Sequence, residues 1–269
     1  MGRFSGYLIV SDIDGTLFNS SYICPEENLR AIEYFKSEGG LFTLASGRSL
    51  YNVSVVGEGL CNTELIGFNG SAIGRYREVM KGFPMPEGFR EDLAALKKRL
   101  PFADMKFLTP EGTFVFDENE YTLIHKCYIT EKQMTPLKSI SDAPDDTMMV
   151  AIWMSEDRIS EATEIAKEMG LHKKYEFVKG FRLAFELIPL GGGKGRAAKE
   201  LKKLENCHTL ITAGDNYNDI SMLKAADISF APRNAEDDIK KAATVSLKRD
   251  CNEGIFPEII EYLERNQEK

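Results

Sequence analysis

The chain has 269 residues, with a hydrophobic content of 43% and a charged content of 28%, values typical of a globular protein with one large or two smaller domains. The net charge of −8 argues against a general nucleic-acid-binding surface, and no apolar stretch approaches the roughly 20 residues of a membrane span. The N-terminus does not fit a secretory signal, and the five cysteines form no C-x-x-C pair, so we expect a cytoplasmic protein without membrane or nucleic-acid partners.

The first part of the chain, up to about residue 82, alternates between strand-like and helix-like segments. Short apolar runs of the kind found in buried parallel strands are separated by stretches with helical spacing of apolar residues. The segments are a strand at 7–10, a helix from Pro25 to about Ser37, a strand at 41–46, a helix from about Ser49 and a strand at 64–68. This order predicts a doubly wound parallel sheet.

The pattern changes between residues 83 and 189, where antiparallel pairs are expected. We predict helices at 87–100, 131–140 and 157–169, strands at 121–128 and 147–154, and hairpins around Pro110-Glu111-Gly112 and Lys179-Gly180. This block is therefore predicted to be an α+β domain.

The first pattern resumes from Gly191. We predict helices at 194–204, 217–225, 235–242 and 254–265, with strands at 208–213, 227–231 and 244–247. The expected architecture is a discontinuous α/β core domain, residues 1–82 and 190–269, with an α+β cap domain, residues 83–189, inserted into it.

Four polar clusters fall where ligands bind in open parallel sheets, at the carboxyl ends of strands or at the start of a helix. They are Asp12 with Asp14, the run Ser46-Gly47-Arg48, Lys194, and the run from Asp215 to Asp219. We expect them to gather at one edge of the sheet.

Asp12 and Asp14 leave an extended chain on the same side, because they are separated by one residue. Mg²⁺ prefers oxygen ligands and usually takes one or two protein carboxylates, and Asp215 fits as a further ligand. An Asx-rich turn is the simpler interpretation of this pair. An EF-hand is excluded, because Thr16 and Leu17 occupy its fifth and sixth positions.

The other clusters also allow simpler interpretations. Ser46 with the backbone N–H of Gly47 suits a phosphate, but a serine there also suits a helix cap. Lys194 opens a helix, which is unfavourable for the helix dipole unless an anion lies there. Gly195 excludes a P-loop, and residues 193–198 match a dinucleotide pattern only formally, because the preceding strand belongs to the antiparallel block. A helix N-cap would explain one acidic residue of the run from Asp215 to Asp219, but not the clustering of Asp215, Asn218 and Asp219.

Together the clusters resemble the haloacid dehalogenase superfamily of phosphatases. The segments "DIDGTL", "ASGR", "GGGKGRA" and "GDNYND" are similar to its four motifs, in the same order. The inserted block resembles the large cap of the Cof-like branch, subclass IIB. The segment "FNGS" at 68–71 is similar to a turn in that branch, although Ser71 stands where alanine is usual.

The resemblance implies a role for each matching residue. Asp12 would be the nucleophile that forms an aspartyl-phosphate, and Asp14 would be the general acid and base. Mg²⁺ would be held by Asp12, by the main-chain carbonyl of Asp14 and by Asp215. The residues expected to bind phosphate or substrate are Ser46, Gly47, Lys194 and Asn218, and those expected to support the site are Asp219, Arg48 and Asn69.

The sequence therefore predicts a Mg²⁺-dependent phosphatase acting on a small phosphorylated metabolite, such as a sugar phosphate. The alternative is phosphoryl transfer within a sugar, as in the phosphomannomutases. A glycosyltransferase with paired aspartates would require neither Lys194 nor the 214–219 cluster, and the intact set of polar residues argues against a binding protein without turnover. A monomer or small homo-oligomer is expected. Candidates for substrate selection in the cap, each also explained by packing or by a surface position, are His125, Trp153, Phe181 and Arg182.

Overall fold

The computed structural model describes residues 2–120, 134–181 and 183–267. The chain divides into two compact units. The first comprises Met1–Ser46, Val53–Ile66 and Lys194–Lys269, and the second comprises Gly47–Asn52 and Gly67–Gly193. The domain bounds expected from the sequence, at residues 83 and 189, stay a prediction.

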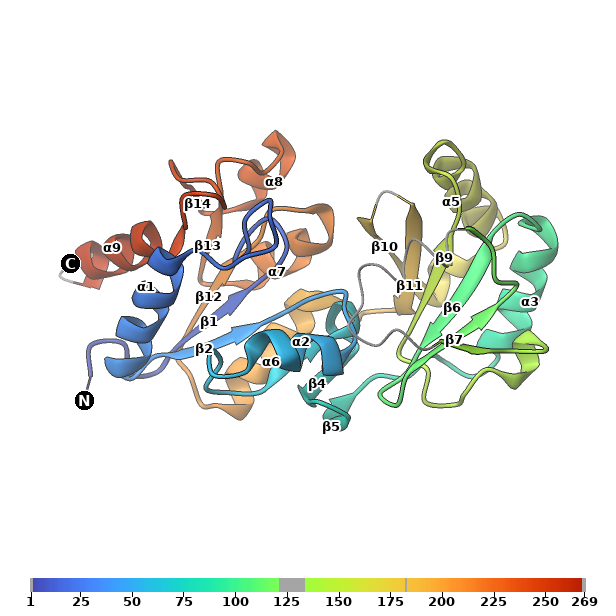
Figure 1. Ribbon diagram of the computed structural model, residues 1–269, viewed down its shortest axis with the longest axis horizontal. Coiled ribbons are helices and arrows are strands. Elements are labelled where there is room, and N and C mark those ends of the chain that lie inside the picture. Colours follow the sequence, from blue (N-terminus) through green and yellow to red (C-terminus); the bar gives the residue numbers. More distant parts are fainter. Residues whose placement is uncertain (1, 121–133, 182, 268–269) are drawn as a thin grey trace. The chain divides into compact units, whose positions relative to one another are not determined.

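The first unit is built on a five-stranded parallel sheet with the strand order β14-β13-β12-β1-β2 (Figure 1). Leu8, Ile9 and Val10 have no exposed surface, because helices cover both faces of the sheet. The strands are β1 (Tyr7–Ser11), β2 (Leu41–Leu44), β12 (Thr209–Ala213), β13 (Ile228–Ala231) and β14 (Val245–Ser246). The short strand β3 (Leu65–Gly67) continues the parallel arrangement through one bridge between Ala45 and Ile66.

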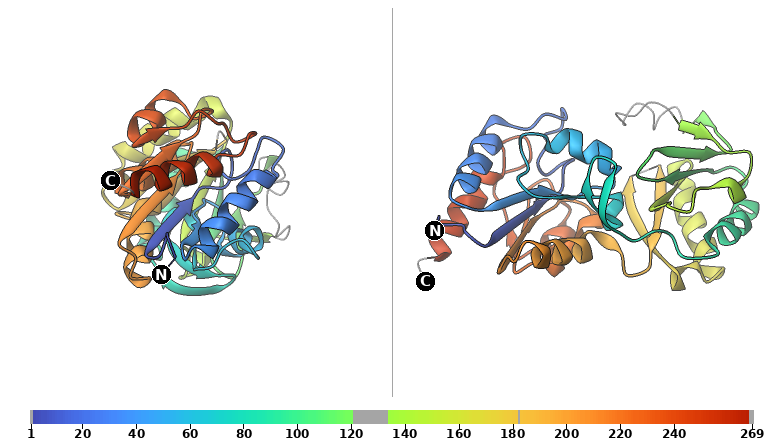
Figure 2. Two further views of the ribbon diagram at one scale, coloured as in Figure 1. Left: turned by 90° about the vertical axis from the view of Figure 1, so that its left-hand side faces the viewer. Right: turned by 90° about the horizontal axis from the view of Figure 1, so that it is seen from below.

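Side-chain contacts show which helices cover each face of this sheet. On one face, α9 (Phe256–Gln267) places Phe256 against Phe42 of β2 and Tyr262 against Phe230 of β13, and α1 (Glu26–Ser37) lies beside it (Figure 2). On the other face, α7 (Ile220–Ala225) accepts a hydrogen bond from Thr212 of β12. The remaining helices of the α/β pattern are α2 (Leu50–Gly57), α6 (Gly193–Leu204) and α8 (Asp237–Ala242). The predicted doubly wound α/β fold is confirmed.

The second unit contains a six-stranded sheet with the order β10-β11-β9-β6-β7-β8. All neighbouring strands are antiparallel except β7 and β8. The elements are α3 (Phe89–Arg99), β6 (Asp104–Leu108), β7 (Thr113–Phe116), β8 (Met134–Pro136), β9 (Met149–Trp153), α5 (Ile159–Glu168), β10 (Tyr175–Phe181) and β11 (Ala184–Pro189). The two helices cover one face, where Leu93 and Ala162 pack in the same core as Phe107 and Ile152.

The structure also contains short 3-10 helices. They are η1 (Phe68–Gly70), η2 (Ile140–Asp142), η3 (Glu156–Arg158), η4 (Leu171–Lys173) and η5 (Tyr217–Asp219). Within the described ranges, no helix combines the length and the apolar character that a membrane crossing requires.

Two expectations about local structure were wrong or incomplete, and one element was not predicted. The helix expected at 131–140 is contradicted over its described part, because β8 pairs with β7 there and η2 follows; residues 131–133 and the strand expected at 121–128 lie outside the described residues. The expected second hairpin is formed by β10 and β11, but its turn does not lie at Lys179-Gly180, where the structure has a register shift inside β10. The hairpin of β4 (Ala72–Arg75) and β5 (Glu78–Gly82) was not predicted.

Candidate functional site

The register of the parallel sheet brings the loops after β1, β2 and β12 to one edge. Ser11 lies opposite both Leu44 and Ala213, which are the last residues of their strands. The backbone N–H of Asp12 donates to Ala213 at 2.9 Å, and that of Ala45 donates to Ser11 at 2.8 Å. Asp12, Ser46 and Asp215 therefore follow three adjacent strand ends. Ser46 is buried, and its N–H donates to the carbonyl of Ile66 at 3.0 Å.

Lys194 is the centre of a buried ion-pair cluster. Its Nζ donates to Asp12 Oδ1 at 2.5 Å and to Asp219 Oδ1 at 2.7 Å, and none of its surface is exposed. Lys194 is the second residue of α6, so the start of this helix delivers the ammonium group to the carboxylate that follows β1.

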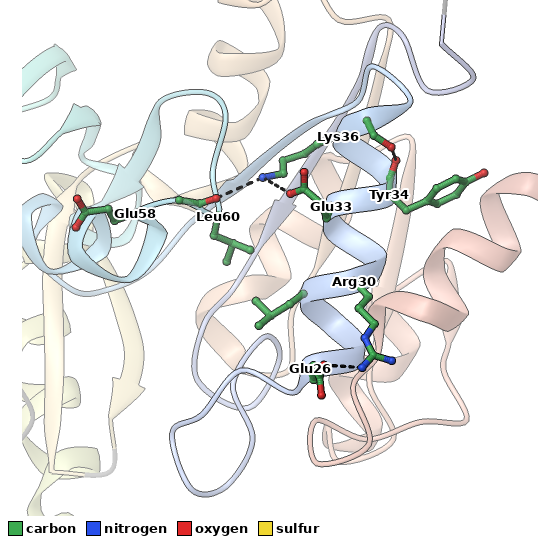
Figure 3. A pocket seen from close by; sticks show the side chains of 10 residues that line it. Glu26, Arg30, Glu33, Tyr34, Lys36, Glu58 and Leu60 are labelled. Carbon is green, nitrogen blue, oxygen red and sulfur yellow. Dashed lines mark hydrogen bonds and ion pairs between the residues drawn. The ribbon is translucent and has the colours of Figure 1, made fainter.

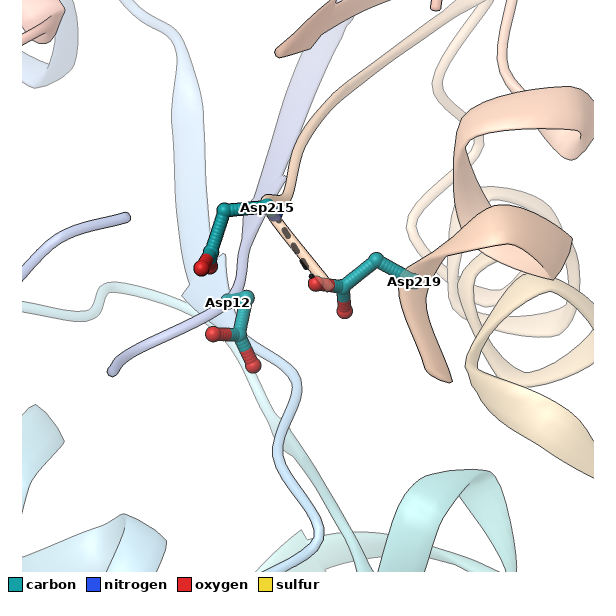
Figure 4. Close-up of side chains that lie close together, drawn as sticks. All are labelled: Asp12, Asp215 and Asp219. Atoms are coloured by element: carbon teal, nitrogen blue, oxygen red, sulfur yellow. Dashed lines mark hydrogen bonds between the residues drawn. The ribbon is translucent and has the colours of Figure 1, made fainter. Parts of the chain in front are cut away.

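Carboxylate oxygens of Asp12, Asp215 and Asp219 lie within 4.8 Å of one another (Figure 4). Both oxygens of Asp219 are engaged, since Oδ1 accepts from Lys194 and Oδ2 accepts the backbone N–H groups of Asp215 and Asn216, each at 3.1 Å. Asp219 therefore holds Lys194 and the 214–216 turn in place. Asp12 and Asp215 are the members of the cluster better placed to share a cation.

The turn after Asp14 packs directly against Asp215. Gly15 has a φ of +88°, and a Cβ atom at this position would overlap Asp215 Oδ2. The hydroxyl of Thr16 donates to Asp215 Oδ1 at 2.6 Å. Sequence reasoning did not assign Thr16 a role, although a hydroxyl two residues beyond Asp14 was a signal that could have found it. Asp14 itself is half-buried beside this turn.

The three carboxylates of Asp12, Asp215 and Asp219 outnumber the single ammonium group of Lys194, which contacts two of them. Burial raises the pKa of Asp215 to about 7, and the Asp219 carboxylate adds to this rise, while the Thr16 hydroxyl and Lys194 oppose it. Burial and the neighbouring carboxylates also raise the pKa of Asp12, against the influence of Lys194. Burial lowers the pKa of Lys194, but Asp12 and Asp219 more than reverse this, so the lysine is protonated. Hard oxygen donors with excess negative charge fit a divalent cation such as Mg²⁺.

Other residues predicted for the site lie in different surroundings. Asn218 is partly buried in η5. Gly47, Arg48 and Asn69 belong to the second unit, so their roles stay predictions. Within that unit, Asn69 is buried with a left-handed φ of 52°, and its Nδ2 donates to Glu186 Oε2 at 2.5 Å.

The cap candidates are only partly described. Trp153 is buried, and the Lys106 Nζ lies 3.9 Å from the centre of its ring, which fits a packing role. His125, Arg182 and the side chain of Phe181 lie outside the described residues.

A separate groove of about 690 Å³ runs between α1 and the turn at 58–60 (Figure 3). None of the four polar clusters contributes to its lining. Its cations are paired locally, Arg30 with Glu26 at 2.5 Å and Lys36 with Glu33 at 3.0 Å. Both cations that line the groove are therefore engaged with carboxylates, which leaves no free cation for a phosphate among its lining residues.

Comparisons with known proteins find similarity over nearly the whole chain. A model of the haloacid dehalogenase-like hydrolase family matches residues 9–259. Phosphatase YwpJ of Bacillus subtilis (strain 168) is 27% identical over 287 residues, covering 90% of this chain and 95% of the relative. The 5-amino-6-(5-phospho-D-ribitylamino)uracil phosphatase YwtE of the same organism is 25% identical over 275 residues, covering 92% and 94%. The solved structure of the subclass IIB sugar phosphatase BT4131 has a TM-score of 0.82 at 21% identity, covering 95% of this chain and 98% of the other, and supports the fold.

Proposed function

Because the chain belongs to the haloacid dehalogenase-like hydrolases, we propose that it is a Mg²⁺-dependent phosphatase that acts through an aspartyl-phosphate on Asp12. The observation that carries this proposal is the buried Lys194 ammonium, which contacts Asp12 Oδ1 at 2.5 Å beside the carboxylates of Asp215 and Asp219. A carboxylate held in this way is oriented for attack, and the cationic group beside it suits a phosphoryl group.

In the first step, an Asp12 oxygen attacks phosphorus and the bond from phosphorus to the ester oxygen breaks. Asp14, entering as a carboxylic acid, gives its proton to the departing oxygen, so an alcohol leaves and Asp14 becomes a carboxylate. The phosphoryl group is now bonded to Asp12.

In the second step, the Asp14 carboxylate takes a proton from a water molecule as the water oxygen attacks phosphorus. The bond between phosphorus and Asp12 breaks, which releases inorganic phosphate and restores the Asp12 carboxylate. Asp14 is again protonated, so both residues return to their starting forms.

Four residues would hold the phosphoryl group during both steps. Lys194 would offset the charge on its oxygens, and the Ser46 hydroxyl and Gly47 N–H would donate to them. Asn218 would contact the phosphate from η5. Asp219 supports this arrangement through its 2.7 Å contact with Lys194, while Arg48 and Asn69 are assigned to supporting or substrate contacts.

The metal would be held by Asp12, by the main-chain carbonyl of Asp14 and by Asp215. When bound, Mg²⁺ would neutralise charge on the phosphoryl oxygens. Thr16 would orient Asp215, because its hydroxyl donates to Asp215 Oδ1 at 2.6 Å.

The substrate class that we propose is a small phosphate monoester of a sugar or polyol. Two similar proteins support this class, because YwtE is a 5-amino-6-(5-phospho-D-ribitylamino)uracil phosphatase and BT4131 is a sugar phosphatase. The net charge of −8 offers no general surface for a polyanionic nucleic acid.

The test is phosphate release from a panel of sugar, polyol and aromatic phosphate esters, with Mg²⁺ or with EDTA. We expect Mg²⁺-dependent turnover of at least one ester, which releases inorganic phosphate and the free alcohol rather than moving the phosphoryl group to another hydroxyl of the same molecule. Asp12→Asn should abolish turnover, while Asp238→Asn, which changes an exposed carboxylate paired with Lys241, should not. Substantial turnover by Asp12→Asn would exclude the proposed nucleophile, and isomerised product would favour a mutase.

A further inference from the structure

Two asparagine side chains connect the loop that carries Asp12 and Asp14 to a distant part of the chain. We call residues 12–20 the nucleophile loop and residues 249–256 the C-terminal segment. Asn234 Nδ2 donates to the carbonyl of Gly15 at 2.8 Å, and its Oδ1 accepts the N–H of Cys251 at 2.9 Å. Asn28 repeats this pattern, donating to Leu17 at 3.0 Å and accepting from Phe256 at 3.0 Å.

The C-terminal segment is itself firmly held. The carboxylate of Glu258 accepts the backbone N–H groups of Lys248 and Arg249, at distances from 3.0 to 3.1 Å. Arg233, which precedes Asn234, forms ion pairs with Asp250 at 2.5 Å and Glu253 at 2.8 Å. The segment is therefore a fixed support against which the nucleophile loop is positioned.

The contact with Gly15 is the one closest to the chemistry. The carbonyl that Asn234 binds belongs to the peptide group joining Gly15 to Thr16, so a rotation of this group would displace residues on both sides. On one side lies Asp14, and on the other Thr16, whose hydroxyl donates to Asp215. Gly15 has a φ of +88°, and its turn is closed locally by hydrogen bonds from the N–H of Gly15 to Phe18 at 3.3 Å and from the N–H of Phe18 to Ile13 at 2.8 Å. The Asn234 contact adds a tertiary restraint on the Gly15 carbonyl.

We propose that Asn234 is a positioning residue for Asp14, acting by fixing the Gly15 carbonyl. This inference rests on the proposed function, because it takes Asp14 as the group that protonates the departing oxygen. Loss of the Asn234 contact would then impair proton donation more than nucleophilic attack, since Asp12 is held separately by Lys194 at 2.5 Å.

The leaving group provides a sharp test. A 4-nitrophenolate departs without being protonated, whereas an alkoxide needs the proton. We expect Asn234→Ala to lower kcat/KM for the best alkyl phosphate of the panel by about 10- to 100-fold more than for 4-nitrophenyl phosphate. Asn234→Asp should behave similarly, because it keeps the acceptor for Cys251 but sets an oxygen against the Gly15 carbonyl. Asn266→Ala, which removes an exposed amide that donates to Tyr262 in α9, is the matched control and should match the wild type.

Hydrogen–deuterium exchange of the peptide covering residues 12–20 gives a readout independent of turnover. We expect faster exchange in Asn234→Ala than in Asn266→Ala. Equal losses on both esters, or unchanged exchange in the loop, would overturn the positioning role. A wild-type protein that hydrolyses neither ester with Mg²⁺ would instead overturn the proposed function, and the exchange result would still decide whether Asn234 fixes the loop.

Discussion

Lys194 and Asp219 form an ion pair with no exposed surface on either side chain, in which Nζ lies 2.7 Å from Oδ1. The same ammonium group also contacts Asp12, so one buried cation serves two carboxylates. Removing one partner of a buried pair leaves a charge that water cannot solvate, which costs far more than loss of a surface pair. This cluster therefore bears on stability as well as on catalysis.

The first prediction concerns stability. Lys194→Met should lower the free energy of unfolding by about 3–5 kcal/mol, because Asp12 and Asp219 would remain buried without their cation. Adding Asp219→Asn should recover part of this loss. Urea unfolding followed by circular dichroism measures both effects, and Lys241→Met, at an exposed pair with Asp238, is the control and should change little. A double variant less stable than Lys194→Met would contradict the argument.

The second prediction concerns pH. Since burial raises the pKa of Asp215 from 3.8 to about 7, protonated Asp215 favours the folded state; this contribution is complete below pH 3.8 and is lost as pH rises through 7. Without metal, stability should therefore decline through this range, and Mg²⁺ should offset the decline by binding the carboxylate. We expect Mg²⁺ to raise the thermal midpoint more at pH 8 than at pH 6, relative to EDTA.

Asp215→Asn serves as the control for this pH dependence. The variant keeps the size of the side chain but cannot ionise, so Mg²⁺ should raise its midpoint little at either pH. Equal Mg²⁺-induced shifts at both pH values in the wild-type protein would contradict the link to Asp215.

The parallel sheet could be predicted because its elements are encoded locally. The continuous apolar run of β1 and the helical spacing of α1 depend on neighbours in sequence, and both segments form as expected. The positions of Asp12 and Asp215 at strand ends followed from these strands, since parallel strands end at one edge. Their grouping into a cluster within 4.8 Å is a finding of the structure.

Most of the features that could not be predicted depend on distant partners. Thr16 and Asp215 are separated by 199 residues, and Asn234 and Gly15 by 219, so no local pattern reveals these hydrogen bonds. The strand β8 forms because β7 offers it a partner, which overrides the helical pattern expected at 131–140. The β4–β5 hairpin was missed because its turn uses Tyr76 at a φ of 56°, where glycine or asparagine would normally signal it.

The third prediction separates backbone strain from crowding at the site. Gly15→Ala and Gly59→Ala both place alanine at a positive φ, of +88° and +72°, which should cost each about 1–2 kcal/mol of stability. Only the Cβ at residue 15 would meet Asp215, whereas nothing lies within 4 Å of one at residue 59. We therefore expect Gly15→Ala alone to weaken Mg²⁺ binding, measured by calorimetry. Equal binding by both variants would show that the contact with Asp215 is unimportant.

The fourth prediction concerns the buried residue Ser71. Its side chain is fully buried, and its hydroxyl makes no hydrogen bond to any part of the chain that the structure describes. A buried hydroxyl without a hydrogen-bond partner is unfavourable, so Ser71→Ala should raise the free energy of unfolding by about 1 kcal/mol without changing turnover. Thr43→Val is the matched comparison, because the buried Thr43 hydroxyl donates to the Glu64 carbonyl at 2.5 Å and its removal should destabilise the fold. Both changes remove one buried hydroxyl, so changes of opposite sign in the free energy of unfolding, measured with urea, would isolate the effect of the hydrogen bond. Destabilisation by Ser71→Ala would instead show that this hydroxyl has a hydrogen-bond partner.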